Sequence, residues 1–240
     1  MIDPNPLALV TGGTRGIGRA IVSALLGEGW SVGFCGRSAT SVERALAELK
    51  PKFGERVGAR VVDVRSSDEI DAFVRWAVEG HGRLDCLVNN AGLGTFAPVD
   101  AITPEQWRET LDTNLSGVFY GIRAAAPVMK KQGSGWILNI ASLASRNAFA
   151  NGAAYNASKF GLIGLSEAAM LDLRHHGIRM AAILPGSVDT DFGHPSAGAE
   201  NSWKLSPDDV ARAVVDLLRY PARALPSLIE LRPSRPPKKG

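Results

Sequence analysis

Tyr155 and Lys159 are the residues of this chain whose types and spacing best suit proton-transfer chemistry. They stand four positions apart in a stretch with a helical pattern, so both side chains project from one face of the expected helix. A neighbouring ammonium favours the phenolate and lowers the tyrosine pKa from about 10 towards neutrality, which suits general acid–base catalysis. Such pairs also occur on ordinary helix surfaces, so this pair gains its meaning from the rest of the chain.

A glycine-rich segment near the N-terminus is the second informative feature. Glycines stand at positions 12, 13, 16 and 18, between the apolar run Leu7–Thr11 and the helical pattern Ile17–Leu26. Glycines allow a tight turn and a close approach to a pyrophosphate, and the following helix N-terminus offers free N–H groups. The spacing departs from the common Gly-x-Gly-x-x-Gly fingerprint, and a glycine-rich turn without a ligand is the alternative. The strand–turn–helix context favours a dinucleotide site.

The end of the second predicted strand, Ser31–Gly36, indicates which dinucleotide is bound. An acidic residue there would bind the ribose 2′-hydroxyl of NAD, whereas an arginine would meet the 2′-phosphate of NADP. This strand is followed by Arg37 and Ser38, so we expect NADP(H), with Arg15 as a second phosphate ligand. Arg37 could also be an ordinary surface arginine. Asp63 could accept a hydrogen bond from the adenine amine or be a turn residue.

The elements that must position these residues alternate regularly between apolar runs and helical patterns. The predicted strands are 7–11, 31–36, 57–62, 84–89, 136–141, 178–184 and 227–231. The predicted helices are 17–26, 41–50, 68–79, 104–131, 153–176 and 207–218, the second stopped by Pro51. This order predicts an α/β fold, a doubly wound, Rossmann-type parallel sheet in a single domain, 1–240. Two long stretches, Gly92–Ile102 and Gly186–Leu205, are expected to be functional loops.

Bulk properties exclude several classes of protein. The chain has 240 residues, 45% hydrophobic and 21% charged, which is enough for one large core. Its net charge of +3 gives no strong case for nucleic-acid or membrane partners. Cys35 and Cys86 have no metal-ligand spacing and are expected to be buried thiols. No signal peptide and no apolar run of roughly 20 residues is evident. We expect a cytoplasmic protein without a metal site.

Several motifs in a fixed order resemble those of the short-chain dehydrogenase/reductase family, in its single-domain branch. They span nearly the whole chain, and together they are specific although each is weak alone. The motifs are Thr11-Gly12-x-x-x-Gly16-x-Gly18, Asn89-Asn90-Ala91-Gly92, Asn114, Ser142, Tyr155-x-x-x-Lys159, and Pro185-Gly186 followed by Thr190.

The resemblance implies a catalytic set of Asn114, Ser142, Tyr155 and Lys159. Tyr155 would be the acid in reduction and the base in oxidation, and Ser142 would hydrogen-bond the substrate oxygen. Lys159 would bind the nicotinamide ribose and lower the tyrosine pKa, and Asn114 would hold a water that links Lys159 to solvent. Structural interpretations stay open: Ser142 could be a small turn residue, and Asn114 could satisfy a helix break. Asn89 is interpreted as structural, bridging neighbouring strands.

The remaining cofactor contacts are also implied by the resemblance. Asn90 to Gly92 would line the ribose and nicotinamide side, Pro185 and Gly186 would shape the nicotinamide pocket, and Thr190 would contact the carboxamide. The full predicted set is Gly12, Thr14, Arg15, Gly16, Ile17, Gly18, Arg37, Ser38, Asp63, Val64, Asn90, Ala91, Gly92, Tyr155, Lys159, Pro185, Gly186, Val188 and Thr190.

Together these observations predict an NADPH-dependent reductase of a ketone or aldehyde, with a 3-oxoacyl thioester as one possible substrate, similar to β-ketoacyl-acyl-carrier-protein reductases and related carbonyl reductases. The alternatives are an NAD(P)+-dependent alcohol dehydrogenase and an NADP-binding sensor without turnover. We expect a homodimer or homotetramer, as in the family, paired through helices 104–131 and 153–176. The predicted substrate surface consists of Leu93, Phe96, Leu143, Phe149, Phe192 and Trp203, and His194 could also touch substrate.

Overall fold

The strands form one parallel sheet in the computed structural model, which describes residues 5–190, 192 and 202–237. Their order across the sheet is β3-β2-β1-β4-β5-β6-β7. The bounds are β1 Leu7–Thr11, β2 Ser31–Gly36, β3 Val57–Val61, β4 Cys86–Asn89, β5 Gly135–Ile140, β6 Ile178–Pro185 and β7 Leu228–Leu231. The chain runs outward from β1 to β3 and then crosses back to β4, so the strand order reverses between β1 and β4. The predicted doubly wound sheet is confirmed.

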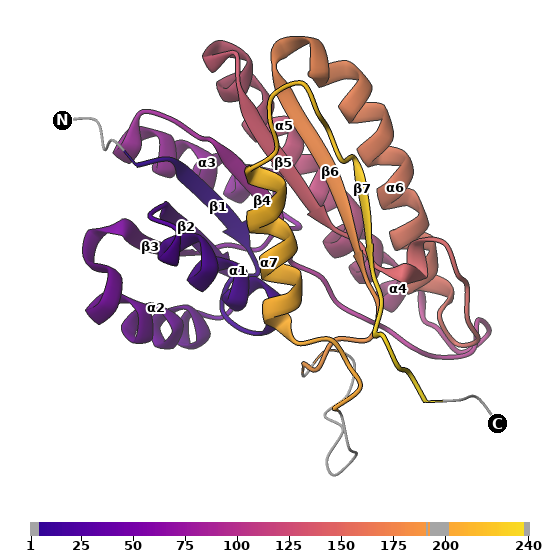
Figure 1. Ribbon diagram of the computed structural model, residues 1–240. Helices are drawn as coiled ribbons and strands as arrows, with labels where there is room; N and C mark the ends of the chain where they lie inside the picture. Colours follow the sequence, from indigo (N-terminus) through magenta and orange to yellow (C-terminus); the bar gives the residue numbers. More distant parts are fainter. Residues whose placement is uncertain (1–4, 191, 193–201, 238–240) are drawn as a thin grey trace.

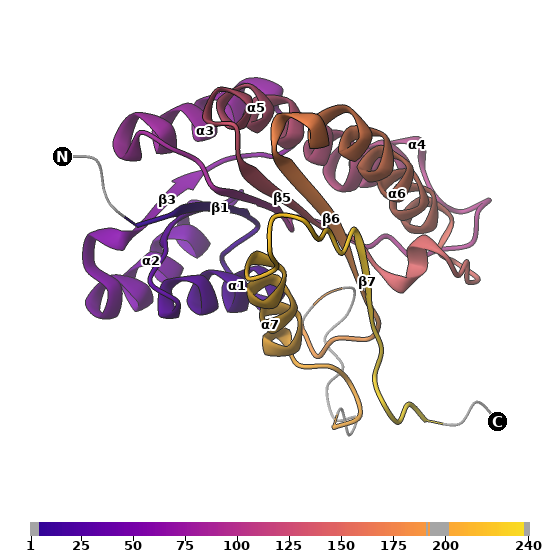
Figure 2. The same ribbon diagram turned by 45° about the horizontal axis from the view of Figure 1, so that its top comes forward.

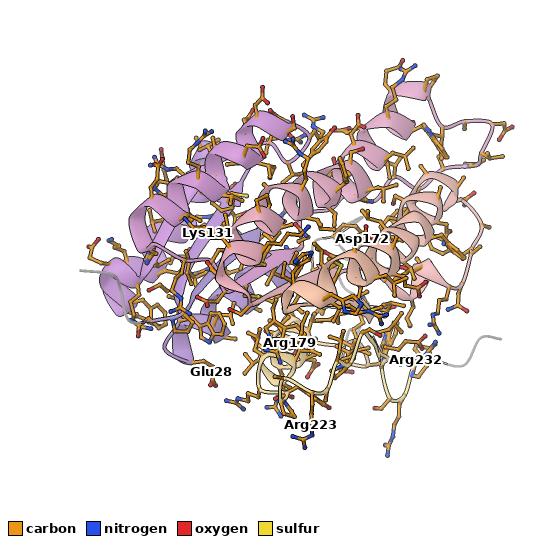
Figure 3. The ribbon with its side chains drawn as sticks, turned by 90° about the horizontal axis from the view of Figure 1, so that it is seen from above. Glu28, Lys131, Asp172, Arg179, Arg223 and Arg232 are labelled. Atoms are coloured by element: carbon orange, nitrogen blue, oxygen red, sulfur yellow. The ribbon has the colours of Figure 1, made fainter. Side chains whose placement is uncertain are left out.

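Helices cover both faces of this sheet (Figure 1). Figure 2 shows α1, α2 and α7 on one face and α3, α5 and α6 on the other. The bounds are α1 Gly16–Gly27, α2 Ala39–Phe53, α3 Ser67–His81, α4 Pro104–Leu111, α5 Gly117–Gln132, α6 Ala153–Leu173 and α7 Pro207–Leu218. Figure 3 shows Glu28, between α1 and β2, on one side of the molecule and Arg232, which follows β7, on the other. Because the strands are parallel, they begin at the edge near Glu28 and end at the edge near Arg232.

Two hydrophobic cores explain why the strands read as continuous apolar runs. All residues of β1 and β5 are buried. Along β1, Leu7 and Leu9 belong to the core beneath α3, α5 and α6, whereas Ala8 and Val10 belong to the core beneath α1, α2 and α7. Successive side chains of a strand point to opposite faces, so a strand covered on both sides must be apolar at every position.

The cysteines lie in these cores, as predicted. Cys35 in β2 and Cys86 at the start of β4 are both fully buried and free. Burial raises the pKa of the Cys35 thiol to about 12 and moves the pKa of Cys86 in the same direction.

Two predictions of helix structure were wrong in detail. The helix predicted to stop at Pro51 continues to Phe53, and Gly54, with φ 57°, ends it. Pro51 falls in the last turn, where its missing N–H removes only one helical hydrogen bond. The helix predicted over 104–131 is continuous in space but contains a π-helical turn at Asp112–Ser116, where the Gly117 N–H bonds to Asp112 O. Short-range patterns do not reveal such a turn, because it inserts a residue without changing the helical composition.

A buried polar chain ties α6 to the middle of the sheet. The Asn89 amide in β4 donates to Asn139 Oδ1 in β5 at 2.9 Å, and Asn139 donates to Ser166 Oγ in α6 at 2.9 Å. The Ser166 hydroxyl in turn donates to the Leu162 carbonyl at 2.7 Å. The structural interpretation of Asn89 agrees with this, although the bridge runs between side chains. Because all three polar residues are buried, each depends on its neighbour for hydrogen bonds.

Replacing Asn139 with alanine is therefore expected to lower the free energy of unfolding by about 2–3 kcal/mol, because it leaves the buried Asn89 amide without its acceptor. Chemical denaturation of Asn139→Ala measures this, with Thr40→Ala on the exposed start of α2 as the matched surface control. The control should stay within about 0.5 kcal/mol of the parent chain. A loss equal to that of the control would show that the polar chain contributes nothing to stability.

Candidate active site

A cleft of about 1240 Å³ opens at the carboxyl edge of the sheet, above the point where the strand order reverses. Its lining comes from the segments that follow β1, β2, β3, β4, β5 and β6 and from the start of α6. Ligands of open α/β sheets bind in this place, because the loops that follow neighbouring parallel strands diverge there and leave a crevice.

The glycine loop lies at one end of the cleft, between β1 and α1. Gly12 adopts φ +68°, and a Cβ at this position would lie 2.9 Å from the Ala91 Cα. A Cβ on Gly18 would lie 2.2 Å from the Gly12 carbonyl oxygen, so the loop can fold back onto α1 only with glycine there. Arg15 precedes the helix in extended conformation and makes no side-chain cap. The first N–H groups of α1 are thus available to an anion.

Hydrogen bonds fix the segment after β4, which lines the next part of the cleft, to the end of β1 and the glycine loop. Asn90, after β4, donates through Nδ2 to the carbonyl oxygens of Thr11 and Gly12 at 3.0 and 3.1 Å. The Thr11 hydroxyl accepts from the backbone N–H groups of Asn90 and Ala91. Thr11 was not among the predicted site residues, although the motif contains it. It positions the loop by holding the ends of β1 and β4 together.

A charged network lies at the end of the cleft beyond β2 and β3. Arg37 donates to Glu109 Oε1 at 3.1 Å, and Arg65 donates to the same oxygen at 3.2 Å. Arg65 also binds both carboxylate oxygens of Asp63, and this contact holds the pKa of Asp63 below its usual range. Arg37 and Asp63 line the cleft. Their partners Glu109, in α4, and Arg65 were not among the predicted site residues. No local pattern links α4 to β2, so only the tertiary fold reveals this contact.

Ser38 does not line the cleft. It is the N-cap of α2, where its hydroxyl accepts from the Ser41 N–H at 3.4 Å. Serine in this position satisfies a helix N–H that has no partner in the helix, and accepting this bond leaves the hydroxyl hydrogen able to donate. Its predicted hydrogen bond to the phosphate stays a prediction.

Tyr155, Ser142 and Lys159 meet in the middle of the cleft. Ser142 follows β5 by two residues, and its hydroxyl accepts from the Ala144 N–H at 3.1 Å. Lys159 Nζ lies 5.8 Å from the centre of the Tyr155 ring and donates to the Ile140 carbonyl at 3.0 Å. An ammonium has three donors, so hydrogen atoms of Nζ remain for a ligand. The pairing expected from the four-residue spacing is therefore present.

Burial determines the charge states of this pair. It raises the pKa of Tyr155, which the adjacent Ser142 hydroxyl partly opposes, and it lowers the pKa of Lys159 to about 8. Both shifts disfavour the charged form of the group, as desolvation does. The expected lowering of the tyrosine pKa towards neutrality is thus outweighed by burial in this structure. Near pH 7 Tyr155 is a neutral phenol and Lys159 is still mostly protonated.

Asn114 lies in the π-helical turn and is buried behind the cleft rather than on its surface. Its side chain accepts from the Leu93 N–H at 2.8 Å and donates to the Leu93 carbonyl and to Ser158 Oγ at 2.8 and 3.0 Å. Its amide thus fastens the loop after β4 to α6, close to Tyr155 and Lys159. The alternative in which Asn114 satisfies a helix break stays a prediction, because these partners lie outside the helix that carries Asn114.

The segment after β6 covers the other side of the glycine loop. Val188 forms a bridge to Leu205, and a Cβ on Gly16 would lie 3.4 Å from the Thr190 methyl group. Pro185, Gly186, Val188 and Thr190 all line the cleft, as do the other predicted cofactor residues except Ser38. Five of the predicted substrate residues line it too, Leu93, Phe96, Leu143, Phe149 and Phe192. Trp203 does not, which corrects that prediction, and His194 lies outside the described residues.

Within the part of the chain that the structure describes, no group of three or more histidine, cysteine, aspartate or glutamate side chains is placed to hold a metal ion. Among the described helices, none has both the length and the apolar character that crossing a membrane requires.

Comparisons with known proteins agree with the geometry. Residues 6–201 match the family described as short chain dehydrogenase. A 3α-hydroxysteroid dehydrogenase from Mediterraneibacter gnavus is 35% identical over 193 residues, covering 80% of this chain and 77% of the relative. A 3-oxoacyl-(acyl-carrier-protein) reductase from Synechocystis is 35% identical over 187 residues, covering 78% and 75%. The structure is similar to that of an alcohol dehydrogenase from Thermococcus sibiricus complexed with 5-hydroxy-NADP, with a TM-score of 0.89, 30% identity, and coverage of 98% and 99%.

The lowered pKa of Lys159 predicts that the protein becomes more stable, relative to a chain without this lysine, as the pH rises above about 8. The unfolded lysine keeps its proton up to about pH 10.4, whereas the folded one loses it near pH 8, so the unfolded state binds more protons between these values. Stability of the parent chain relative to Lys159→Met should rise by about 3 kcal/mol from pH 8 to 10.5 and stay level below pH 8. Denaturation at several pH values measures it, with Lys131→Met on the exposed end of α5 as control. Parallel pH profiles for the parent chain and Lys159→Met would contradict the shift.

Proposed function

Because the chain belongs to the short-chain dehydrogenase family, we propose that it reduces the carbonyl group of a ketone or aldehyde with NADPH, with Tyr155 as the general acid. The observation that carries this proposal is the meeting of Tyr155, Ser142 and Lys159 in the same cleft as the glycine loop. A 3-oxoacyl thioester is one substrate of this class, and a similar protein is a 3-oxoacyl-(acyl-carrier-protein) reductase.

The residues of the cleft fit NADP(H). The N-terminus of α1 and the glycine loop would hold the pyrophosphate, because free N–H groups and a positive helix dipole end face this part of the cleft. Arg37 and Arg15 would bind the 2′-phosphate, and no acidic residue directly follows β2 to take the 2′-hydroxyl of NAD. When the 2′-phosphate binds, Arg37 would exchange its contact with the exposed Glu109 carboxylate for a contact with a phosphate dianion. The complex of the Thermococcus sibiricus enzyme with 5-hydroxy-NADP supports the assignment.

NADPH supplies the hydride, and the protein supplies position and protons. Negative charge develops on the carbonyl oxygen during reduction, and Ser142 donates a hydrogen bond to it. Tyr155 then donates its phenolic proton to this oxygen. Burial keeps Tyr155 protonated before the reaction, and the Lys159 ammonium 5.8 Å from its ring centre stabilises the phenolate that results.

We propose that Asn114 positions the segments next to the reacting groups. Its side chain contacts Leu93 and Ser158, so it fixes the loop after β4 against the turn of α6 that carries Lys159. A role for Asn114 in a proton relay stays a prediction.

The reverse reaction, oxidation of a secondary alcohol, uses the same groups with Tyr155 as base. The relationship to a 3α-hydroxysteroid dehydrogenase favours keeping this as the second candidate function. A binding protein without turnover is not favoured, because all the predicted catalytic side chains lie in or directly behind the cleft.

Assembly into a homodimer or homotetramer stays a prediction. The outer surface of α4, α5 and α6 carries large hydrophobic side chains that are 40% to 52% exposed, namely Trp107, Phe119, Phe160 and Leu171. Burial of such a surface against a second copy would remove apolar area from water and favours pairing. A location in the cytoplasm also stays a prediction.

Tyr155→Phe is expected to reduce turnover by about 100-fold or more, because it removes the transferred proton without changing the shape of the cleft. NADPH affinity should stay within a few-fold of the parent value. Loss of NADPH absorbance with a panel of ketones measures turnover, and fluorescence titration measures binding. Turnover that survives this substitution would assign the acid to another group.

Arg37→Asp is expected to shift the ratio of kcat/KM for NADPH over NADH towards NADH by about 10-fold or more, because an aspartate repels the 2′-phosphate and accepts from a 2′-hydroxyl. Steady-state kinetics with both cofactors measure the ratio. Arg44→Asp makes the same charge change on the exposed face of α2 and is the control. Equal ratios in the two variants would remove Arg37 from the phosphate site.

A further inference from the structure

Three phenylalanine rings surround the ring of Tyr155 at the substrate end of the cleft. The ring centres of Phe96, Phe192 and Phe149 lie 5.5, 5.8 and 6.5 Å from that of Tyr155. Phe96 and Phe149 also contact each other, with centres 5.9 Å apart. Each of the three phenylalanines is 37% to 47% exposed although it lines the cleft, so each keeps ring surface free for a ligand.

Glycines in the backbone next to these rings leave space for them. A Cβ on Gly94 would lie 2.7 Å from the Phe96 ring and 3.0 Å from that of Phe192, so glycine lets both rings lie against the loop after β4. A Cβ on Gly152 would lie 2.7 Å from the Phe149 ring. The two loops are joined by a hydrogen bond from the Ala97 N–H to the Asn151 carbonyl at 2.9 Å.

Asn156, the residue after Tyr155, holds the loop that carries Phe149. It is buried, donates to the Ala144 carbonyl at 2.8 Å, and accepts from the Phe149 N–H at 3.3 Å. The position of the Phe149 ring is therefore tied to the helix turn that carries the catalytic phenol. Rings fixed in this way lose little conformational freedom when a ligand binds.

The chemistry of this surface selects a flat apolar group. Aromatic rings attract one another edge to face or offset, and the interplanar angles of 46° to 67° among these four rings are of that kind. Arg232, a charged residue that follows β7 and lines the cleft, is paired with Glu230 at 2.8 Å, so an anionic substrate that binds Arg232 would have to displace that contact.

We propose that the substrate carries an aromatic ring close to its carbonyl group, and that Phe96, Phe149 and Phe192 bind this ring while Ser142 and Tyr155 bind the oxygen. This inference depends on the proposed reductase function. It assigns to the three phenylalanines the selection of ketones or aldehydes that carry an aromatic ring over aliphatic ones of the same size.

The test compares phenylacetone with cyclohexylacetone, two unconjugated ketones that differ in the aromaticity of one ring. For the parent enzyme, kcat/KM should be higher for phenylacetone. In Phe149→Leu and in Phe96→Leu, the phenyl-to-cyclohexyl ratio should fall by about 2- to 12-fold, because each leucine keeps apolar volume and removes one aromatic contact. The ratio between two ketones cancels any general loss of activity.

The matched control is Phe53→Leu at the end of α2, which does not line the cleft and should leave the ratio unchanged. An unchanged ratio in both cleft variants overturns the inference, and so does a parent enzyme that prefers the cyclohexyl ketone. Reduction of a 3-oxobutanoyl thioester without reduction of either ketone also overturns it while leaving the reductase function intact. Binding of NADPH without reduction of any carbonyl compound refutes the proposed function itself.

Discussion

The Lys159 ammonium is buried beside Tyr155, and this burial limits how α6 can pack against the sheet. A charged group in the interior is unfavourable unless it has partners, and the Ile140 carbonyl at the end of β5 provides one. The helix that carries the pair must therefore stay fixed against the sheet. It is held by Asn139 through Ser166 near its middle and by Asn114 through Ser158 near its start. These polar contacts are buried with the pair, so the positions of Tyr155 and Lys159 are determined by the fold and not by a mobile loop.

The balance of charge in the site follows from the same burial. Desolvation raises the pKa of the phenol and lowers that of the ammonium, so the resting cleft holds a neutral acid next to a cation that is close to its own titration range. This arrangement favours delivery of a proton to an oxygen that becomes negative. The ring centres of Phe96 and Phe149 lie 5.5 and 6.5 Å from that of Tyr155, so apolar carbon borders the acid on that side.

Much of this arrangement follows from local sequence patterns, and the remainder depends on contacts between distant segments. The strands are predictable because burial on both faces leaves only apolar residues in them. The glycine loop is predictable because a side chain at position 12 or 18 would clash with the backbone, so the glycines that the fold requires are visible in the sequence. The π turn around Asn114 and the continuation of α2 through Pro51 are not predictable, because each depends on how one turn of helix distributes its hydrogen bonds. The contact of Arg37 with Glu109 is not predictable, because these residues are far apart in sequence. No local pattern indicates that Trp203 lies outside the cleft lining. That the chain is one domain stays a prediction.

The two thiols have a consequence for the setting in which this catalyst can work. Only a thiolate reacts readily with peroxide, disulfides or alkylating compounds, and burial keeps both Cys35 and Cys86 protonated and out of reach. Neither sulfur lies in the described lining of the cleft. The folded molecule thus presents no reactive thiol to solvent, and oxidants can inactivate it through cysteine only after the fold itself has opened.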